Sequence, residues 1–219
     1  MASGLPSLPP AFAQGLVLID EAHSQDPNKI DGPDGPKTLP YELHYARKMT
    51  RWLEARCPDA SPELQLACRA QHFKSLRLVA DGSSPIGLPH DAPGIPHVAG
   101  QAKDAGRHAG GLRCWRRRPS RCRSPRRRAR IAALVRKESL ATDAETQALE
   151  DVACLVFLDD QFDDFEAKAD IDEDKVVGIL RKTWAKMSEP GRALALGMDL
   201  SERAKLLIGR ALEPQDAAA

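Results

Sequence analysis

Aromatic side chains are scarce in this sequence: Phe, Trp and Tyr make up 5% of its 219 residues. Aliphatic and alanine side chains must therefore supply most of any core. A chain of this length can bury one sizeable core and suggests one or two domains. Strand-like alternation and internal repeats are also missing, which favours an all-α domain.

Long apolar runs and closely paired cysteines are absent as well. No apolar run approaches the roughly 18 residues that suggest a membrane span. The N-terminal MASGLPSLPP lacks the basic and apolar regions of a secretory signal. The five cysteines include no CxxC pair, so we expect reduced thiols. We therefore expect a cytoplasmic protein, with the nucleus as the alternative, and no membrane partner.

Charge is distributed unevenly along the chain. Ten arginines and no acidic residue lie between Arg113 and Arg130, in a protein whose net charge is +1. Removing these ten charges leaves −9 for the remainder, so an acidic body carries one strongly basic segment. At face value this segment would bind RNA or DNA through the phosphates, with a strong salt dependence.

Apolar residues recur at three- and four-residue spacing in several segments, which is typical of amphipathic helices. Helices are predicted over residues 11–24, 41–57, 61–72, 129–138, 172–187 and 200–212. The third opens with Ser61 as N-cap and Pro62 as first helical residue. The Pro- and Gly-rich residues 26–40 predict a long loop, and residues 188–191 are interpreted as the end of the preceding helix.

Residues 142–169 are predicted to form the central helix. Thr142 and Glu145 have the spacing of a capping box at its start. Residues 152–158 are apolar nearly all round, so other helices should enclose this part. Glu150 and Asp151 come directly before that run, and a buried carboxylate requires a partner. These two residues are therefore the first place to look for chemistry.

Several segments together resemble the family known as domain of unknown function 4202. They are the DPN of the first loop, YELHYARKMTRWL, LACRAQHFK, LVRKESLATDAETQALEDVACLVFL and ILRKTWAKMS. The resemblance covers roughly residues 11–75 and 129–190 and implies a helical fold without an established activity. Some members carry a glutamyl-tRNA synthetase label. Lys186-Met187-Ser188 is similar to the start of a class I synthetase KMSKS loop, but no HIGH sequence or strand–helix nucleotide fold accompanies it. A helix end is favoured.

The resemblance stops between about residues 76 and 128. Family members usually continue with a Tyr-Pro-Met-Thr-Arg-type loop and a basic helix, which this chain lacks. Under the genetic code, residues 87–109 are compatible with a one-nucleotide shift that would restore such a segment. We hypothesise that residues 76–128 are a frameshifted or mis-spliced translation, and we predict that they are disordered. Nucleic acid is accordingly the less favoured partner.

His44, His72 and Asp151 form the first candidate site. Their order along the helices is similar to that of the metal ligands in HD-type phosphohydrolases, which activate water for phosphoester hydrolysis. Imidazole and carboxylate together suit Mn, Fe or Zn. Phe73 follows His72 where those enzymes have Asp, so a degenerate divalent-metal site is predicted. The alternative is that the histidines are ordinary helix residues and that Asp151 pairs with an arginine.

A set of basic side chains forms the second candidate site, and its ligand would be a phosphorylated small molecule. Arginine forks match phosphate oxygens in geometry. The alternative is a set of surface salt bridges on an acidic protein. The candidates are Lys74, Arg136, Lys137, Arg181 and Lys182. An acidic cluster lacks the Gly and Glu of a calcium loop and is interpreted as a solvated helix end. Its members are Asp159, Asp160, Asp163, Asp164, Asp170, Asp172 and Asp174.

Together these patterns predict an all-α, single-domain protein, distantly similar to HD-type helical domains, with a long disordered insertion. Residues 11–75 and 129–212 would form the domain, 1–10 a mobile tail, and 213–219 a second tail. We expect a degenerate metal- or phosphate-binding site, and any enzymatic activity would be metal-dependent phosphoester hydrolysis. A non-catalytic helical protein-interaction module is the alternative. Substrate and oligomeric state are left open.

Overall fold

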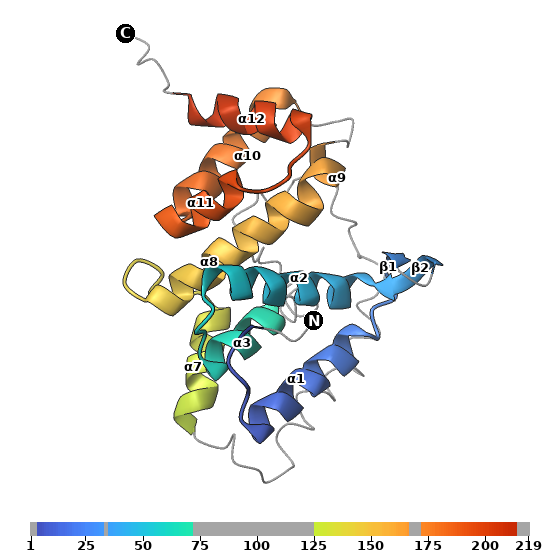
Figure 1. Cartoon of the computed structure of the whole chain (residues 1–219), viewed down its shortest axis with the longest axis vertical. Coiled ribbons are helices and arrows are strands. Elements are labelled where there is room, and N and C mark those ends of the chain that lie inside the picture. The colour runs from blue at the N-terminus through green and yellow to red at the C-terminus, as the bar shows by residue number, and fades with distance from the viewer. Residues whose placement is uncertain (1–3, 33–34, 72–124, 167–171, 214–219) are drawn as a thin grey trace, which may run out of the picture.

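The computed structural model describes residues 4–32, 35–71, 125–166 and 172–213. One helical path runs through the middle: α8 (Ala144–Val156), the π-helix η3 (Phe157–Gln161) and α9 (Phe162–Glu166). On one side lie α1 (Pro10–His23), α2 (Tyr41–Arg56), α3 (Pro62–Arg69) and α7 (Pro125–Val135), and on the other α10 (Glu173–Lys186), α11 (Glu189–Leu196) and α12 (Glu202–Leu212) (Figure 1). The prediction of an all-α single domain is confirmed, apart from one small hairpin. The likeness to HD-type domains stays a prediction.

Two groups of buried apolar side chains flank this path. The first lies between α2, α3, α7 and α8, and the second between α8, η3, α10 and α12. Val152 and Val156 face the first group and Leu155 faces the second, and all three are fully buried. Trp52 of α2 packs against both groups. The predicted enclosure of the apolar stretch of α8 is therefore confirmed.

A β-hairpin occupies the segment that was predicted to be an irregular loop. Its strands, β1 (Lys29–Gly32) and β2 (Gly35–Pro40), pair antiparallel, with Lys29 opposite Pro40. The prediction was wrong because both strands of a two-stranded ribbon are edges, and edge strands tolerate proline. Gly35 also adopts a φ of 120°, which an L side chain rarely reaches.

The DPN sequence closes this hairpin onto the start of α2. The Asp26 carboxylate accepts hydrogen bonds from the backbone N–H groups of Asn28 and Glu42, both at 3.0 Å. The carbonyl of Asn28 accepts one from the N–H of Tyr41 at 2.9 Å. Pro40, the N-cap residue of α2, has no side-chain acceptor. Asp26 therefore supplies the cap from the preceding loop.

The N-terminal cap of α8 lies one residue later than predicted. Asp143 accepts hydrogen bonds from the backbone N–H groups of Glu145 and Thr146 at 3.0 and 3.2 Å. The Thr142 hydroxyl instead donates to a carbonyl of the preceding turn. With Asp143 as the cap, Glu145 is the second helical residue rather than the third and cannot close a capping box. Hydrogen bonds from the Arg130 guanidinium lower the pKa of Asp143 to about 2.

The C-terminal side contains a helix that the sequence analysis missed. Helices over 172–187 and 200–212 are confirmed within one or two residues as α10 and α12. Between them, Ser188 caps α11 by accepting a hydrogen bond from the Gly191 N–H at 3.4 Å, and Pro190 lies in its first turn. Residues 188–191 therefore begin a helix, whereas they were predicted only to end one. The same Ser and Pro signal had correctly predicted α3.

The predicted disordered segment, 76–128, lies almost wholly outside the described residues. Its end is the exception, because α7 begins at Pro125 rather than at Ala129. The predicted mobile tail is described from Gly4 onward. The Gly4 N–H donates to the Glu54 carboxylate at 2.6 Å, and the buried side chain of Gln65 donates to the carbonyl of Pro6. Residues 4–9 thus lie against α2 and α3.

The cysteines of the described ranges, Cys57, Cys68 and Cys154, are free thiols, as expected for three of the five. Cys68 and Cys154 are buried, and burial raises the pKa of Cys154 to about 12. A thiol with so high a pKa is a core group rather than a nucleophile. No helix in the described parts of the chain is long and apolar enough to cross a membrane.

Candidate functional site

Asp151 of α8 is fully buried and accepts four hydrogen bonds. Its Oδ2 accepts from Arg56 Nε at 2.7 Å and from the Ser188 hydroxyl. Its Oδ1 accepts from the Ser188 N–H at 2.7 Å and from Gln147 Nε2 at 3.0 Å. A carboxylate offers about four acceptor positions, so none is left for a ligand. The predicted alternative, in which Asp151 pairs with an arginine, is the one observed.

Glu150, next to Asp151, is also buried and also paired. Its Oε2 contacts Lys137 Nζ, and its Oε1 lies 3.8 Å from Lys186 Nζ. Lys137 lies in a turn where it and Ser139 both have a φ of 57°, a sparsely populated conformation for residues other than glycine. This turn holds the Lys137 ammonium against Glu150. Glu150 and Asp151, together with the side chains bonded to them, form the first polar cluster. This cluster holds α8 against its neighbours.

The KMS sequence belongs to the same junction. Lys186 is the last residue of α10, and its carbonyl accepts a hydrogen bond from Gln147 at 2.9 Å. Met187 is buried, and Ser188 caps α11 while donating to Asp151. These contacts account for all three residues. The predicted helix end is confirmed.

A second polar cluster lies where η3 passes α2. His44 Nε2 lies 2.5 Å from Asp160 Oδ1, and Lys48 Nζ lies 3.6 Å from the same oxygen. Asp159 accepts hydrogen bonds from Lys48 Nζ at 2.8 Å and from Trp52 Nε1 at 3.0 Å. The side chains of His44 and Asp160 are 22% and 13% exposed. Unlike Asp151, this cluster is open to solvent.

The π-helix allows consecutive residues to reach the same neighbouring helix. Asp159 and Asp160 bond to α2 side chains, and the Gln161 amide contacts the Tyr41 hydroxyl. In an α-helix successive side chains are about 100° apart, so three in a row would not face one neighbour. A π turn is wider and brings them closer together. Such turns are often found at functional sites.

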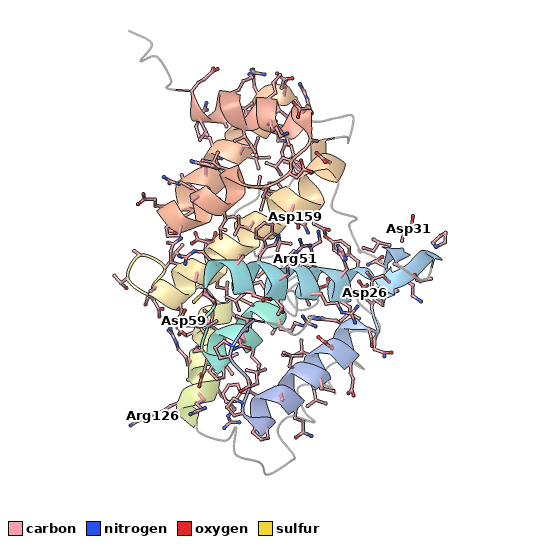
Figure 2. The ribbon with its side chains drawn as sticks, in the orientation of Figure 1. Asp26, Asp31, Arg51, Asp59, Arg126 and Asp159 are labelled. Atoms are coloured by element: carbon pink, nitrogen blue, oxygen red, sulfur yellow. The ribbon has the colours of Figure 1, made fainter. Side chains whose placement is uncertain are left out.

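Asp159 and Asp160 were predicted to belong to a solvated helix end. Asp159 is exposed, as predicted, but both carboxylates are also paired with side chains of α2, which the prediction did not include. Burial tends to raise the pKa of Asp159, but hydrogen bonds from Lys48 and Trp52 outweigh it, and the pKa is lowered. The positive charge of Arg51 adds to this lowering, and Figure 2 shows Arg51 and Asp159 close together.

Arg47 and Arg51 form a basic strip on the exposed face of α2. They lie four residues apart, so their Cβ atoms are about 5–6 Å from each other. Both are exposed, and neither forms a hydrogen bond or ion pair within the described part of the chain. His44 and Lys48 share this side of the helix. We call Arg47 and Arg51 the α2 basic strip.

The structure does not bring His44 and Asp151 together. His44 bonds to Asp160, whereas Asp151 bonds to Arg56, which lies about 18 Å further along α2. One ion cannot reach both side chains across that separation. Within the described residues no group of three or more His, Cys, Asp or Glu side chains could hold a metal ion. His72 lies outside them, so a metal site that includes it stays a prediction.

The predicted phosphate-binding residues are also separated. The observed partners are Glu138 for Arg136, Glu150 for Lys137 and the carbonyl of Ala211 for Arg181. Arg181 therefore contacts α12, while Arg136 and Lys137 belong to the turn before α8. Lys74 lies outside the described residues. Lys182 is exposed on α10. A phosphate site that combines these five positions stays a prediction.

The described end of the arginine stretch contacts the protein itself. Arg127 lies with Nε 3.6 Å from Glu63 and with its guanidinium carbon 5.4 Å from the centre of the Phe12 ring. Arg130 binds Asp143 and Glu145. Arg127 and Arg130 thus connect α7 to α1, α3 and the start of α8.

The sequence analysis missed Asp160, Arg47 and Arg51 as site residues. One signal was present: His44, Arg47, Lys48 and Arg51 have the spacing of one helix face. That spacing could have identified the α2 basic strip. The pairing of Asp160 with His44 had no such signal, because it depends on how η3 lies against α2.

The family described as Domain of unknown function (DUF4202) matches residues 13–83 and 122–208. These ranges include α2, α3, α8 and α10, and therefore both polar clusters. The unmatched residues between them fall where the sequence resemblance stops. No curated protein and no solved structure matches the chain. The predicted membership is confirmed, and this chain belongs to the DUF4202 family.

Proposed function

We propose that this protein binds a phosphorylated small molecule at the α2 basic strip. The observation that supports this is the pair of exposed guanidinium groups of Arg47 and Arg51, which have no partner in the described part of the chain. A guanidinium presents a planar fork of donors that matches two phosphate oxygens. The ligand class is the one predicted from the sequence, at different residues.

The surrounding charges support a small ligand rather than a polymer. Lys48 is paired with Asp159 and Arg56 with Asp151, so these two cations are already neutralised. Arg47 and Arg51 have no hydrogen bond or ion pair within the described residues, although the charge of Arg51 also acts on nearby Asp159. Two guanidinium groups match the charge of one phosphate monoester. A nucleic acid usually requires more phosphate contacts than this.

Thermal unfolding of the full chain with inorganic phosphate, AMP and adenosine tests the proposal. At constant ionic strength, phosphate and AMP should raise the Tm, and adenosine, which lacks phosphate, should not. In the Arg47→Ala/Arg51→Ala variant the affinity for phosphate should fall at least about tenfold. Each hydrogen bond to a charged group contributes roughly 1.5–3 kcal/mol.

The matched control is the Arg126→Ala/Arg128→Ala variant. It removes two exposed arginines from α7 and changes the net charge by the same amount. Phosphate binding should be retained in this control. Equal losses in both variants would indicate a general charge effect, and an unchanged Tm of the wild-type protein with phosphate would refute the proposed site.

A further inference from the structure

We infer that His44 is a catalytic residue: a general base that activates water to hydrolyse the phosphate ester bound at the α2 basic strip. Asp160 is its positioning residue. This inference rests on the proposed phosphate binding and adds a reaction to it. Three observations support the inference: the hydrogen bond of the His44 ring, the partial exposure of the His44 side chain, and the position of His44 beside Arg47.

The carboxylate of Asp160 determines which ring nitrogen of His44 carries hydrogen. A carboxylate only accepts hydrogen bonds, so His44 Nε2, 2.5 Å from Asp160 Oδ1, is the donor. In the neutral imidazole the lone pair is then on Nδ1. No hydrogen bond within the described residues involves Nδ1. An imidazole oriented by a carboxylate on one side and open on the other has the arrangement of a general base.

The environment of the pair suits this role. The His44 side chain is 22% exposed, so water and an ester can reach it. Asp160 is more enclosed, and Lys48 Nζ lies 3.6 Å from its Oδ1. Asp160 and its neighbour Asp159 come from η3, whereas Lys48 comes from α2. The oriented ring is therefore held between two helices and not on a loop.

The position of His44 relative to the α2 basic strip allows both to act on one ligand. Arg47 lies three residues after His44, and residues at this spacing have Cβ atoms about 5–6 Å apart on a helix surface. A phosphate held by the Arg47 and Arg51 forks therefore lies within reach of a water molecule on Nδ1 of His44. The guanidinium groups would also stabilise the negative charge on the phosphate oxygens during the reaction.

The reaction is balanced with water as the second substrate. His44 Nδ1 accepts a proton from water while the water oxygen forms a bond to phosphorus. The bond between phosphorus and the ester oxygen breaks on the side opposite to the water. The leaving oxygen takes a proton from solvent, and the imidazolium releases its proton to solvent. The products are an alcohol and inorganic phosphate. His44 returns to its neutral form, and no electrons are transferred.

The test is hydrolysis of p-nitrophenyl phosphate by the full chain, with binding of inorganic phosphate measured on the same samples. The wild-type protein should turn over this ester. The His44→Ala variant should lose about 100-fold or more in kcat, still bind phosphate, and recover part of its rate with added imidazole. The Asp160→Asn variant should lower kcat while KM stays unchanged, and Asp160→Glu should recover part of the loss.

Three results would overturn the inference. One is a wild-type protein that binds phosphate without hydrolysing the ester, which leaves the proposed binding intact. Another is a His44→Ala or His44→Gln variant as fast as the wild type, and the glutamine variant covers the case in which the alanine variant does not fold. The third is absence of phosphate binding, which ends the proposed function as well. The control is the Lys205→Ala variant, on α12, which is purified in the same way and should keep the wild-type rate.

Discussion

Two pairs of consecutive acidic residues lie on the same helical path but in different environments. Glu150 and Asp151 on α8 are buried, and lysines, an arginine and a serine occupy their oxygens. Asp159 and Asp160 on η3 are partly exposed, and Asp160 bonds to a histidine whose second nitrogen has no hydrogen bond within the described residues. A saturated carboxylate connects helices. The proposed ligand site lies at the partly exposed cluster.

The largest predicted effect on stability comes from removing the buried carboxylate of Asp151. Asp151→Ala should lower the free energy of unfolding by about 3 kcal/mol, because it leaves Arg56 and the Ser188 N–H without their acceptor. Urea denaturation measures this. Asp160→Asn should lower the same quantity by less than about 1 kcal/mol, because its pair is partly exposed. Equal losses would contradict the distinction between the two pairs.

A smaller effect on stability is predicted at Gly191, which lies close to the buried carboxylate of Asp151. A Cβ at Gly191 would lie 2.7 Å from Asp151 Cγ, so Gly191→Ala should displace the carboxylate and lower the free energy of unfolding by about 1–3 kcal/mol. The matched control is Gly209→Ala on α12, where a Cβ would meet nothing within 4 Å. This variant should be stabilised by about 0.5–1 kcal/mol through helix propensity. A stable Gly191→Ala protein would show that the packing around Asp151 is loose.

The smallest effect concerns a third, more exposed carboxylate, that of Asp143. Asp143→Ala should lower the free energy of unfolding by about 1 kcal/mol, because it removes the N-cap of α8. Thr142→Ala should change it much less, since the Thr142 hydroxyl does not cap the helix. The reverse order in chemical denaturation would restore Thr142 as the cap.

The loss of stability in the Asp143→Ala variant should also depend on pH. The pKa of Asp143 is about 2 in the folded protein, against an ordinary value of 3.8. Because the folded state has the lower pKa, the contribution of the carboxylate is complete above about pH 4 and is lost as the pH falls toward 2. The stability difference between wild type and Asp143→Ala should shrink over this range. A difference that stays constant would mean that Arg130 does not hold the ionised form.

Local chemistry made much of the fold predictable. The apolar periodicity located α2, α10 and α12, and the Ser61-Pro62 signal located the start of α3. The errors arose where a local signal was ambiguous. Thr142 and Asp143 are both good N-caps, and Ser188 both follows the end of α10 and caps the start of α11. The hairpin was missed because proline and glycine usually interrupt strands, whereas a two-stranded ribbon accepts them.

The candidate site was less predictable than the fold. Asp151 was correctly singled out, because a carboxylate beside an apolar run must find a partner. Which partner it finds depends on residues far away in the sequence, Arg56 and Ser188. The proximity of His44 to Asp160 likewise depends on the antiparallel passage of η3 along α2. Hydrophobic periodicity reports which face of a helix is buried, but not which helix lies against it.

The amino-acid sequence by itself determined that this protein is helical, that α8 lies at its centre, that the acids of α8 need partners and that the chain belongs to its family. These properties follow from local spacing, caps and burial. Only the tertiary structure decided that Asp151 is saturated, that Asp160 orients His44 and that Arg47 and Arg51 remain exposed beside them. The physical reason is that hydrogen bonds and ion pairs act over a few ångströms, and only the folded chain brings residues 44 and 160 to that distance.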